Sequence, residues 1–229
     1  MTEKRLFNFS AGPAVLPESV LETIRDEMLC LPGCGASILE ISHRSKQFIA
    51  IQEQTKQRLI RLLKIPQTHD VLFLQGGARL QFSMVPMNLL RGSSTAAQYI
   101  VTGSWGKYAV GEAKKEGPVE VIYDGSSHHY SQLPKPTEVT VRPDAAYLHL
   151  TSNETIQGIQ FQEDWQVPCP LVVDCSSDFM YRPLEISKYG IVYACAQKNA
   201  GPAGVTVVII RKDLLERSAD SLPGYLSYR

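Results

Sequence analysis

Short apolar runs alternate with amphipathic helical segments along most of this chain, and this alternation constrains its fold more than any other feature. The apolar runs fall at residues 71–74, 98–102, 119–123, 147–150, 171–173, 191–194 and 205–210. Helical spacing of apolar residues occupies residues 17–31, 46–63, 79–90 and 107–115. This alternation predicts an α/β fold with a mostly parallel sheet flanked by helices. The last two runs are joined by a link too short for a crossover helix, so we expect that pair to be antiparallel and the sheet to be mixed.

The charge balance and the lack of long apolar stretches limit the classes of partner. The 23 basic and 23 acidic residues cancel, so nothing indicates nucleic acid or an anionic membrane as a partner. No stretch approaches the roughly 18 consecutive apolar residues of a membrane span, and the first residues lack the apolar run of a signal peptide. The five cysteines lie mostly inside apolar runs, which is typical of reduced core residues. We therefore expect a cytoplasmic protein that acts on small molecules.

Lys198 is the strongest candidate for chemistry, because it follows an apolar run and enters a glycine-rich loop. Small residues surround it, with Ala194-Cys-Ala-Gln before it and Asn-Ala-Gly-Pro-Ala-Gly204 after it. Burial lowers the pKa of an amine toward neutrality, and small neighbours leave room for a flat cofactor. Both conditions favour a lysine that forms a Schiff base. The alternative, a surface lysine in a hairpin loop, is disfavoured by the alanines and glycines.

Two further strand ends carry groups that suit a phosphorylated aromatic cofactor. Asp174 ends an apolar run, where a carboxylate could keep the pyridine nitrogen of pyridoxal phosphate (PLP) protonated, although an Asp that only caps a turn is equally common. The segment Gly76-Gly-Ala-Arg79 lies between a run and a helix, where free N–H groups offer an anion site. Glycines there also serve tight packing, but the positive charge of Arg79 opposes the helix dipole and so favours a binding role.

Three other positions have a functional and a structural interpretation. Trp105 follows an apolar run and could stack on a ring, while core packing is as common for tryptophan. Thr155 could donate its hydroxyl to a ring oxygen, and a plain turn explains its segment equally well. The pair His43-Arg44 lies between two helical segments, where the guanidinium could hold a carboxylate or simply be solvated. No cysteine or histidine spacing typical of a metal site occurs, so no metal is expected.

Six segments of the chain closely resemble the phosphoserine aminotransferases, which are class V aminotransferases of the fold-type I PLP superfamily. They are residues 7–17, 41–44 (Ile-Ser-His-Arg), 76–82 (Gly-Gly-Ala-Arg-Leu-Gln-Phe), 153–158 (Asn-Glu-Thr-Ile-Gln-Gly), 174–177 (Asp-Cys-Ser-Ser) and 196–204 (Ala-Gln-Lys-Asn-Ala-Gly-Pro-Ala-Gly). The resemblance runs along essentially the whole chain, and together the segments are highly specific. It implies the large PLP-binding domain of a fold-type I aminotransferase.

The resemblance also implies roles for the cofactor contacts. Lys198 would bind PLP covalently and Asp174 would face the pyridine nitrogen, which makes these two the catalytic pair. Trp105 would stack on the ring, and Thr155 would meet its phenolic oxygen. The remaining cofactor contacts that the resemblance implies are Ala78, Arg79 and Gln197. Ala78 stands where relatives often have glycine, and the backbone amide survives that change.

The implied reaction passes the amino group of L-glutamate to 3-phosphohydroxypyruvate, giving phosphoserine and 2-oxoglutarate. Arg44 matches the arginine that holds the glutamate carboxylate, while His43 and Arg79 match positions near the substrate phosphate. Some bacterial relatives also aminate a related phosphorylated hydroxy-keto acid on the route to pyridoxine. Sites of this superfamily are assembled from two subunits, so a homodimer is expected.

Members of this family continue well beyond Arg229, and this difference in length bears on the domains. The resemblance implies an extended segment at residues 1–15, an incomplete large domain at 16–229, and no C-terminal small domain. The part that relatives add carries an Asn-Thr pair for the cofactor phosphate and a further substrate arginine. A second interpretation is therefore a catalytically silent fragment that only binds PLP or a partner subunit. A third is another fold-type I enzyme such as a cysteine desulfurase, in which a histidine commonly stands where this chain has Gln197.

Overall fold

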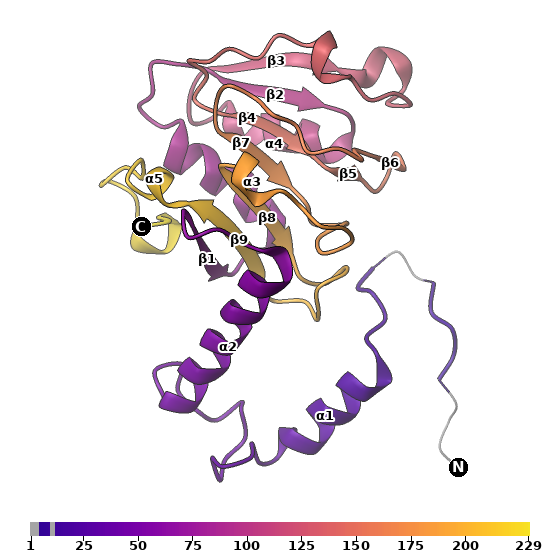
Figure 1. Cartoon of the computed structure of the whole chain (residues 1–229), viewed down its shortest axis with the longest axis vertical. Helices are drawn as coiled ribbons and strands as arrows, with labels where there is room; N and C mark the ends of the chain where they lie inside the picture. The colour runs from indigo at the N-terminus through magenta and orange to yellow at the C-terminus, as the bar shows by residue number, and fades with distance from the viewer. Residues whose placement is uncertain (1–4, 10–11) are drawn as a thin grey trace.

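The computed structural model describes residues 5–9 and 12–229, which form one seven-stranded sheet with flanking helices (Figure 1). The sheet contains β1 (His69–Leu74), β2 (Ala97–Val101), β3 (Val119–Asp124), β4 (Leu148–Thr151), β7 (Leu171–Asp174), β8 (Ile191–Cys195) and β9 (Thr206–Arg211). A separate hairpin pairs β5 (Asn153–Glu154) with β6 (Ile159–Gln160). The α-helices are α1 (Glu18–Met28), α2 (Lys46–Leu63), α3 (Gly77–Leu89), α4 (Ser104–Ala113) and the short α5 (Lys212–Leu215). The 3-10 helices are η1 (Gly125–His128), η2 (Pro136–Glu138), η3 (Ile186–Lys188) and η4 (Gly224–Leu226).

The strand order is β1-β9-β8-β7-β4-β2-β3, and this mixed sheet confirms the predicted fold class. The pairs β2–β3, β2–β4, β4–β7 and β7–β8 are parallel. Strand β9 runs antiparallel to both β8 and β1, so the predicted antiparallel final pair is confirmed. Every predicted apolar run matches a strand, with at most one residue of the run outside it. The predicted helices shift by no more than three residues at either end, which is close to the usual uncertainty of such boundaries.

The predicted extended segment at residues 1–15 has neither helix nor strand over its described part, 5–9 and 12–15, whereas residues 1–4 and 10–11 lie outside the described residues. Helix α1 follows it and buries none of its residues. Its apolar side chains Val20, Leu21 and Ile24 are exposed, and Figure 1 shows α1 lying apart from the sheet. In the described part of the chain, no helix combines the length and the apolar character needed to cross a membrane.

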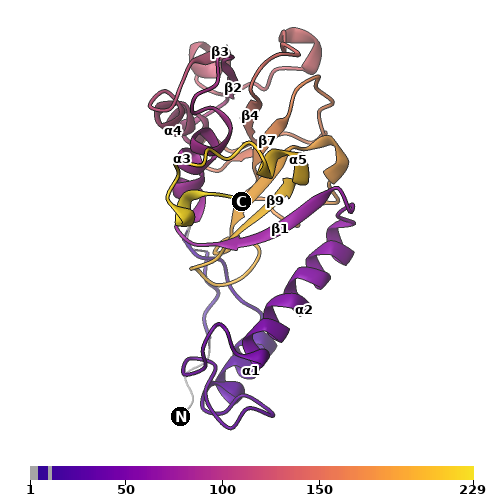
Figure 2. The same cartoon turned by 90° about the vertical axis from the view of Figure 1, so that its left-hand side faces the viewer.

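Alternation along the strands divides the core into two clusters, one for each face of the sheet. In β9, Val207 and Ile209 belong to one cluster and Val208 and Ile210 to the other, because successive side chains of a strand point to opposite faces. The first cluster includes Leu59 of α2, and the second is built with α3 and α4. Figure 2 shows α3 and α4 on one side of the sheet and α2 on the other. Since both faces are covered, the central strands β4, β7 and β8 are buried at every position.

The direction of the strands decides where polar side chains gather. The carboxyl ends of β1, β2, β4, β7 and β8 all lie at one edge of the sheet, the edge where β9 begins. Ligands of open α/β sheets bind at this edge, because the loops that leave the strands converge there. The residues that follow these strands are therefore the ones expected to form a site.

Candidate active site

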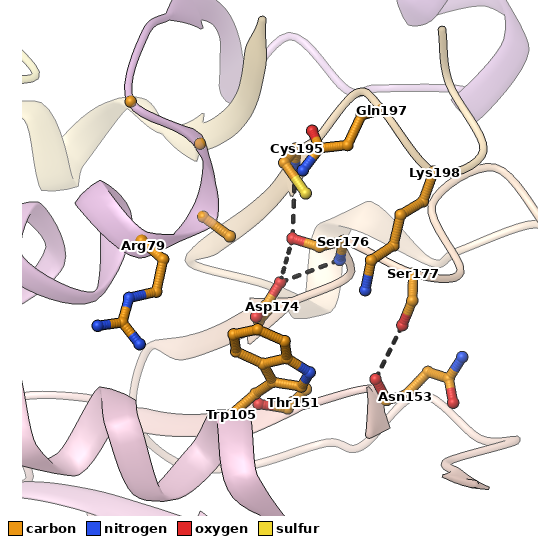
Figure 3. A pocket seen from close by; sticks show the side chains of 13 residues that line it. Arg79, Trp105, Thr151, Asn153, Asp174, Ser176, Ser177, Cys195, Gln197 and Lys198 are labelled. Carbon is orange, nitrogen blue, oxygen red and sulfur yellow. Dashed lines mark hydrogen bonds between the residues drawn. The ribbon is translucent and has the colours of Figure 1, made fainter. Parts of the chain in front are cut away.

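A pocket of about 230 Å³ lies at this edge of the sheet (Figure 3). Its lining residues follow or end five strands: Gly76, Gly77, Ala78, Arg79, Trp105, Thr151, Asn153, Asp174, Ser176, Ser177, Cys195, Gln197 and Lys198. The structure thus brings together six of the predicted site residues, namely Ala78, Arg79, Trp105, Asp174, Gln197 and Lys198. Two other predicted residues, His43 and Arg44, do not line it.

Lys198 lies in the turn that follows β8, and its side chain is half-buried. Its Nζ donates a hydrogen bond to Oγ1 of Thr155 at 3.1 Å, so the remaining predicted cofactor contact stands beside the pocket. The same Nζ lies 5.7 Å from the centre of the Trp105 ring. Figure 3 shows the lysine reaching from its loop toward Trp105, with Arg79 on the opposite side of the pocket. Lys198 is therefore held between a hydroxyl and an aromatic face.

Asp174 is the last residue of β7, and its carboxyl group is buried beneath the pocket. Its Oδ1 accepts hydrogen bonds from the backbone N–H of Ser176 at 3.0 Å and from Oγ of the same serine at 2.6 Å. The backbone N–H of Cys195 donates in turn to that Oγ at 3.2 Å, which ties β7 to β8 (Figure 3). Burial raises the pKa of Asp174 to about 6, against the opposing effects of the Ser176 hydrogen bonds and the positive charge of Lys198.

The N-terminus of α3 forms another wall of the pocket. Gly76 and Gly77 have φ angles of 87° and 63°, a left-handed conformation that favours glycine, and no side chain caps the helix. The N–H groups of the first turn therefore lie open at the positive end of the helix dipole. The exposed Arg79 adds a charge, and its guanidinium lies 4.8 Å from the centre of the Tyr108 ring. This wall can bind a phosphate group.

Two polar atoms of the lining are buried without a hydrogen-bond partner in the described part of the chain. They are Nε1 of Trp105 and Oγ1 of Thr151. Buried polar atoms are nearly always satisfied in folded proteins, so unpaired ones in a pocket wall indicate that a bound molecule supplies the partner. The pocket thus combines a lysine, a buried carboxyl group, an anion-binding helix end and an aromatic face.

Several lining residues were not singled out from the sequence: Thr151, Asn153, Ser176, Ser177 and Cys195. A signal existed for Ser176, because a serine two residues after an Asp at a strand end is typical of an Asx turn. Thr151 and Cys195 are the last residues of buried strands, and nothing in the sequence separates them from core residues. Ser177 donates to the backbone oxygen of Asn153 at 2.9 Å, a contact between distant loops.

His43 and Arg44 are exposed in the turn that precedes α2. Ser42 accepts a hydrogen bond from the backbone N–H of Arg44 at 3.1 Å, which fixes the turn but not the guanidinium. Neither residue reaches the pocket of its own chain.

A mixed sheet of this order, with Lys198 and the buried Asp174 at its carboxyl edge, agrees with the arrangement that the resemblance to the aminotransferases implies. The family model for Aminotransferase class-V matches residues 6–225, and the chain belongs to this family. Within it, the chain is similar to phosphoserine aminotransferases. The phosphoserine aminotransferase of Rhodopirellula baltica is 56% identical to it over 228 residues, which cover 99% of this chain and 61% of that relative.

Solved structures of phosphoserine aminotransferases are also similar to this chain. The phosphoserine aminotransferase from Bacillus circulans subsp. alkalophilus has a TM-score of 0.94 and 46% identity, covering 98% of this chain and 62% of that one. The crystal structure of a PLP-bound phosphoserine aminotransferase from Trichomonas vaginalis has a TM-score of 0.90 and 40% identity, covering 98% and 63%. The chain therefore spans about three fifths of the length of the relatives it matches.

Proposed function

We propose that this chain binds PLP in the pocket and takes part in transamination between L-glutamate and 3-phosphohydroxypyruvate, giving O-phospho-L-serine and 2-oxoglutarate. The observation that carries the proposal is the meeting of Lys198, Asp174 and the N-terminus of α3 in one pocket. The similarity to phosphoserine aminotransferases supports the choice of substrates. The related phosphorylated hydroxy-keto acid of pyridoxine synthesis has the same chemistry and is a second proposed substrate.

The residues present fit the cofactor. In this proposal Lys198 supplies the amine, Asp174 pairs with the pyridine nitrogen and Trp105 offers a ring face, and the presence of all three in the lining of one pocket supports these roles. The open N–H groups at the start of α3 suit the cofactor phosphate. The unpaired Nε1 of Trp105 and Oγ1 of Thr151 offer donors to a ligand rich in acceptor oxygens. When bound, PLP supplies an electron sink for the carbanion formed at the α-carbon of the substrate.

The protein residues have distinct roles in this proposal. Lys198 binds the cofactor and carries the proton that transamination moves, since its Nζ is the amine that faces the pocket. Asp174, in its low-dielectric setting, holds a positive charge on the ring nitrogen of the cofactor more strongly than a solvated carboxylate would. Thr155 orients Lys198 through the 3.1 Å hydrogen bond, while Ala78, Arg79 and Gln197 complete the cofactor contacts.

The test is covalent capture of PLP by Lys198. PLP is added to the protein, the Schiff base is reduced with borohydride, and the modified peptide is identified by its mass. We expect the label on Lys198 in the wild type, no label at that peptide in Lys198→Ala, and unchanged labelling in Lys107→Ala, which removes an exposed lysine of α4. An unlabelled wild type would contradict PLP binding. Phosphoserine formation that depends on glutamate would exclude the silent-fragment alternative.

We also propose that the protein acts in the cytoplasm as a homodimer, in which each pocket receives residues from the other subunit. His43 and Arg44 support this, since they match substrate-binding positions but do not reach their own pocket. Co-expression of Lys198→Ala with Arg44→Ala tests it, because mixed dimers contain one pocket with both residues intact. Activity in the mixture well above that of either variant alone is expected. Activity no higher than the sum of the two variants would contradict a shared site.

A further inference from the structure

Glu154 is a carboxylate with 0% exposure that joins two parts of the pocket wall. It ends β5, and its Oε2 accepts a hydrogen bond from the backbone N–H of Trp105 at 3.0 Å. Its Oε1 accepts another from the backbone N–H of Gly106 at 2.8 Å. Both donors belong to the first turn of α4, whose own N-cap residue makes no side-chain hydrogen bond. Glu154 therefore caps α4 from a different element of the chain.

A second residue of the same hairpin repeats this arrangement. Oε1 of Gln157 accepts from the backbone N–H of Ser104 at 3.2 Å, and its Nε2 donates to Oγ of Ser104 at 3.0 Å. The approach is close, because a Cβ placed on Gly103 would lie 2.6 Å from Cδ of Glu154. Three successive N–H groups of α4 are thus satisfied by two side chains of the β5–β6 hairpin.

The position of Glu154 links both neighbours of the reactive lysine. Thr155, which accepts the hydrogen bond from Lys198, is the next residue in the chain. Trp105, whose ring lies beside the same Nζ, is held at its backbone by the Glu154 carboxylate. A shift of the β5–β6 hairpin relative to α4 would therefore move the hydroxyl of Thr155 away from the indole of Trp105. A buried carboxylate costs free energy unless its hydrogen bonds compensate, and here they bridge two elements of the site.

We propose that Glu154 is a positioning residue that locks the β5–β6 hairpin to the N-terminus of α4 and so places Thr155 and Trp105 around Lys198. The part of this inference that concerns cofactor affinity rests on the proposed function. The part that concerns the placement of Trp105 does not, since the contacts are present in the chain alone.

The experiment uses Trp105 as its own reporter. The chain has two tryptophans, so Trp165→Phe leaves Trp105 as the single emitter, and all variants are made in that background. Glu154→Gln keeps the shape but turns an amide N–H2 toward a backbone N–H, whereas Glu154→Ala removes both acceptors. The control is Asp164→Asn, another carboxylate that accepts from a backbone N–H, that of Glu185 at 2.7 Å, and does not line the pocket.

Two readouts are measured on each folded variant. Without cofactor, acrylamide quenching of the Trp105 emission should rise in Glu154→Gln, rise further in Glu154→Ala, and stay at the parent value in Asp164→Asn. With PLP, titration should show a dissociation constant on the order of tenfold higher for Glu154→Gln, because displaced Thr155 and Trp105 side chains would together lose contacts with the cofactor equivalent to about one hydrogen bond. The control should bind PLP as the parent does.

The outcomes separate the two proposals. Quenching in Glu154→Gln equal to that of the parent overturns the positioning role, as does an equal rise in Asp164→Asn. A parent that fails to bind PLP contradicts the proposed function, while the quenching series still decides the role of Glu154. If the Glu154 variants do not fold, Gln157→Ala tests the contact between the hairpin and α4 at a partly exposed residue. A smaller rise in acrylamide quenching is then expected, and unchanged quenching overturns the inference.

Discussion

Nζ of Lys198 donates a hydrogen bond to Oγ1 of Thr155 at 3.1 Å, although 43 residues separate the two in the chain. The lysine follows β8, and the threonine follows β5, so the contact depends on the packing of the hairpin beside the sheet. It orients the ammonium group without any bound molecule. The hydroxyl is also free to donate its own hydrogen to a ligand, since it accepts from the lysine.

Removing this hydroxyl should affect the site more than the fold. Thr155→Val keeps the side-chain shape, and because Thr155 is exposed the free energy of unfolding should change by no more than about 0.5 kcal/mol. PLP affinity should fall by roughly three- to tenfold, as expected for the loss of one hydrogen bond of about 1 kcal/mol. Urea unfolding and a PLP titration measure the two effects. Thr137→Val, at an exposed threonine of η2, is the matched control and should change neither.

The buried carboxyl group of Asp174 predicts a stability that depends on pH. Its pKa of about 6 in the folded protein exceeds the unfolded value of about 3.9, so the folded state binds more protons between these values. Stability from this group therefore falls as pH rises from about 4 to about 6, by on the order of 3 kcal/mol. Asp174→Asn stays neutral and keeps the acceptor for Ser176. It should be more stable than wild type at neutral pH, lose that advantage at about pH 4, and bind PLP more weakly.

Asp164 supplies a control, because its pKa is shifted in the direction opposite to that of Asp174. Burial alone would raise its pKa, but hydrogen bonds from Arg182, the backbone of Glu185 and Tyr189 lower it below the ordinary value. A lowered pKa contributes stability above the unfolded value that is lost as pH falls. Asp164→Asn should therefore destabilise the protein at neutral pH, with the difference shrinking in acid. If urea unfolding gave both Asn variants the same pH dependence, burial of Asp174 would not be the cause.

The elements of the fold were predictable because each leaves a local signal. The run at 205–210 is apolar except at Thr206, because β9 is covered on both faces, and its direction followed from the short link to β8. The placement of β1 was not predictable. It pairs with β9, from the far end of the chain, and that pairing is set by packing between distant residues rather than by any local pattern.

The site was predictable only where a residue type is unusual for its position. Lys198 and Asp174 are charged groups at the ends of apolar runs, a position where a charged side chain is uncommon without a function. Thr151 and Glu154 carry no such signal, since a threonine that ends a strand and a glutamate in a turn are ordinary. Their importance comes from burial and from partners far away in sequence, as with the 48 residues between Glu154 and Gly106.

Tyr108 should control how well Arg79 serves the phosphate end of the pocket. The guanidinium lies 4.8 Å from the centre of its ring, a cation–π contact at an exposed position that contributes about 0.5–1 kcal/mol. Tyr108→Ala should weaken binding of inorganic phosphate about two- to fivefold because the arginine gains freedom. Tyr108→Phe keeps the ring and should bind as wild type does. Calorimetric titration with phosphate measures this, and equal weakening in both variants would assign the effect to the hydroxyl instead.

Gly76 is the glycine at the N-terminus of α3 where substitution by alanine should destabilise the protein most. Its φ of 87° strains any other residue, and a Cβ there would lie 2.4 Å from Cδ2 and 2.7 Å from Cβ of Leu80. Gly76→Ala should therefore lower the free energy of unfolding by roughly 1–3 kcal/mol. Gly77→Ala has the strained φ of 63° but meets no atom within 4 Å, so it should cost only about 1 kcal/mol.

The contact with Leu80 can be separated from the backbone strain by a second substitution. Leu80→Ala removes Cδ2 but keeps the Cβ that lies 2.7 Å away, so in that background Gly76→Ala should cost less than in wild type but more than Gly77→Ala. Gly201→Ala, at a glycine without a positive φ or a neighbour within 4 Å, is the control and should stay within about 0.5 kcal/mol of wild type. Equal costs at Gly76 and Gly77 in urea unfolding would show that the approach of Leu80 contributes nothing and that backbone strain alone requires glycine at the start of α3.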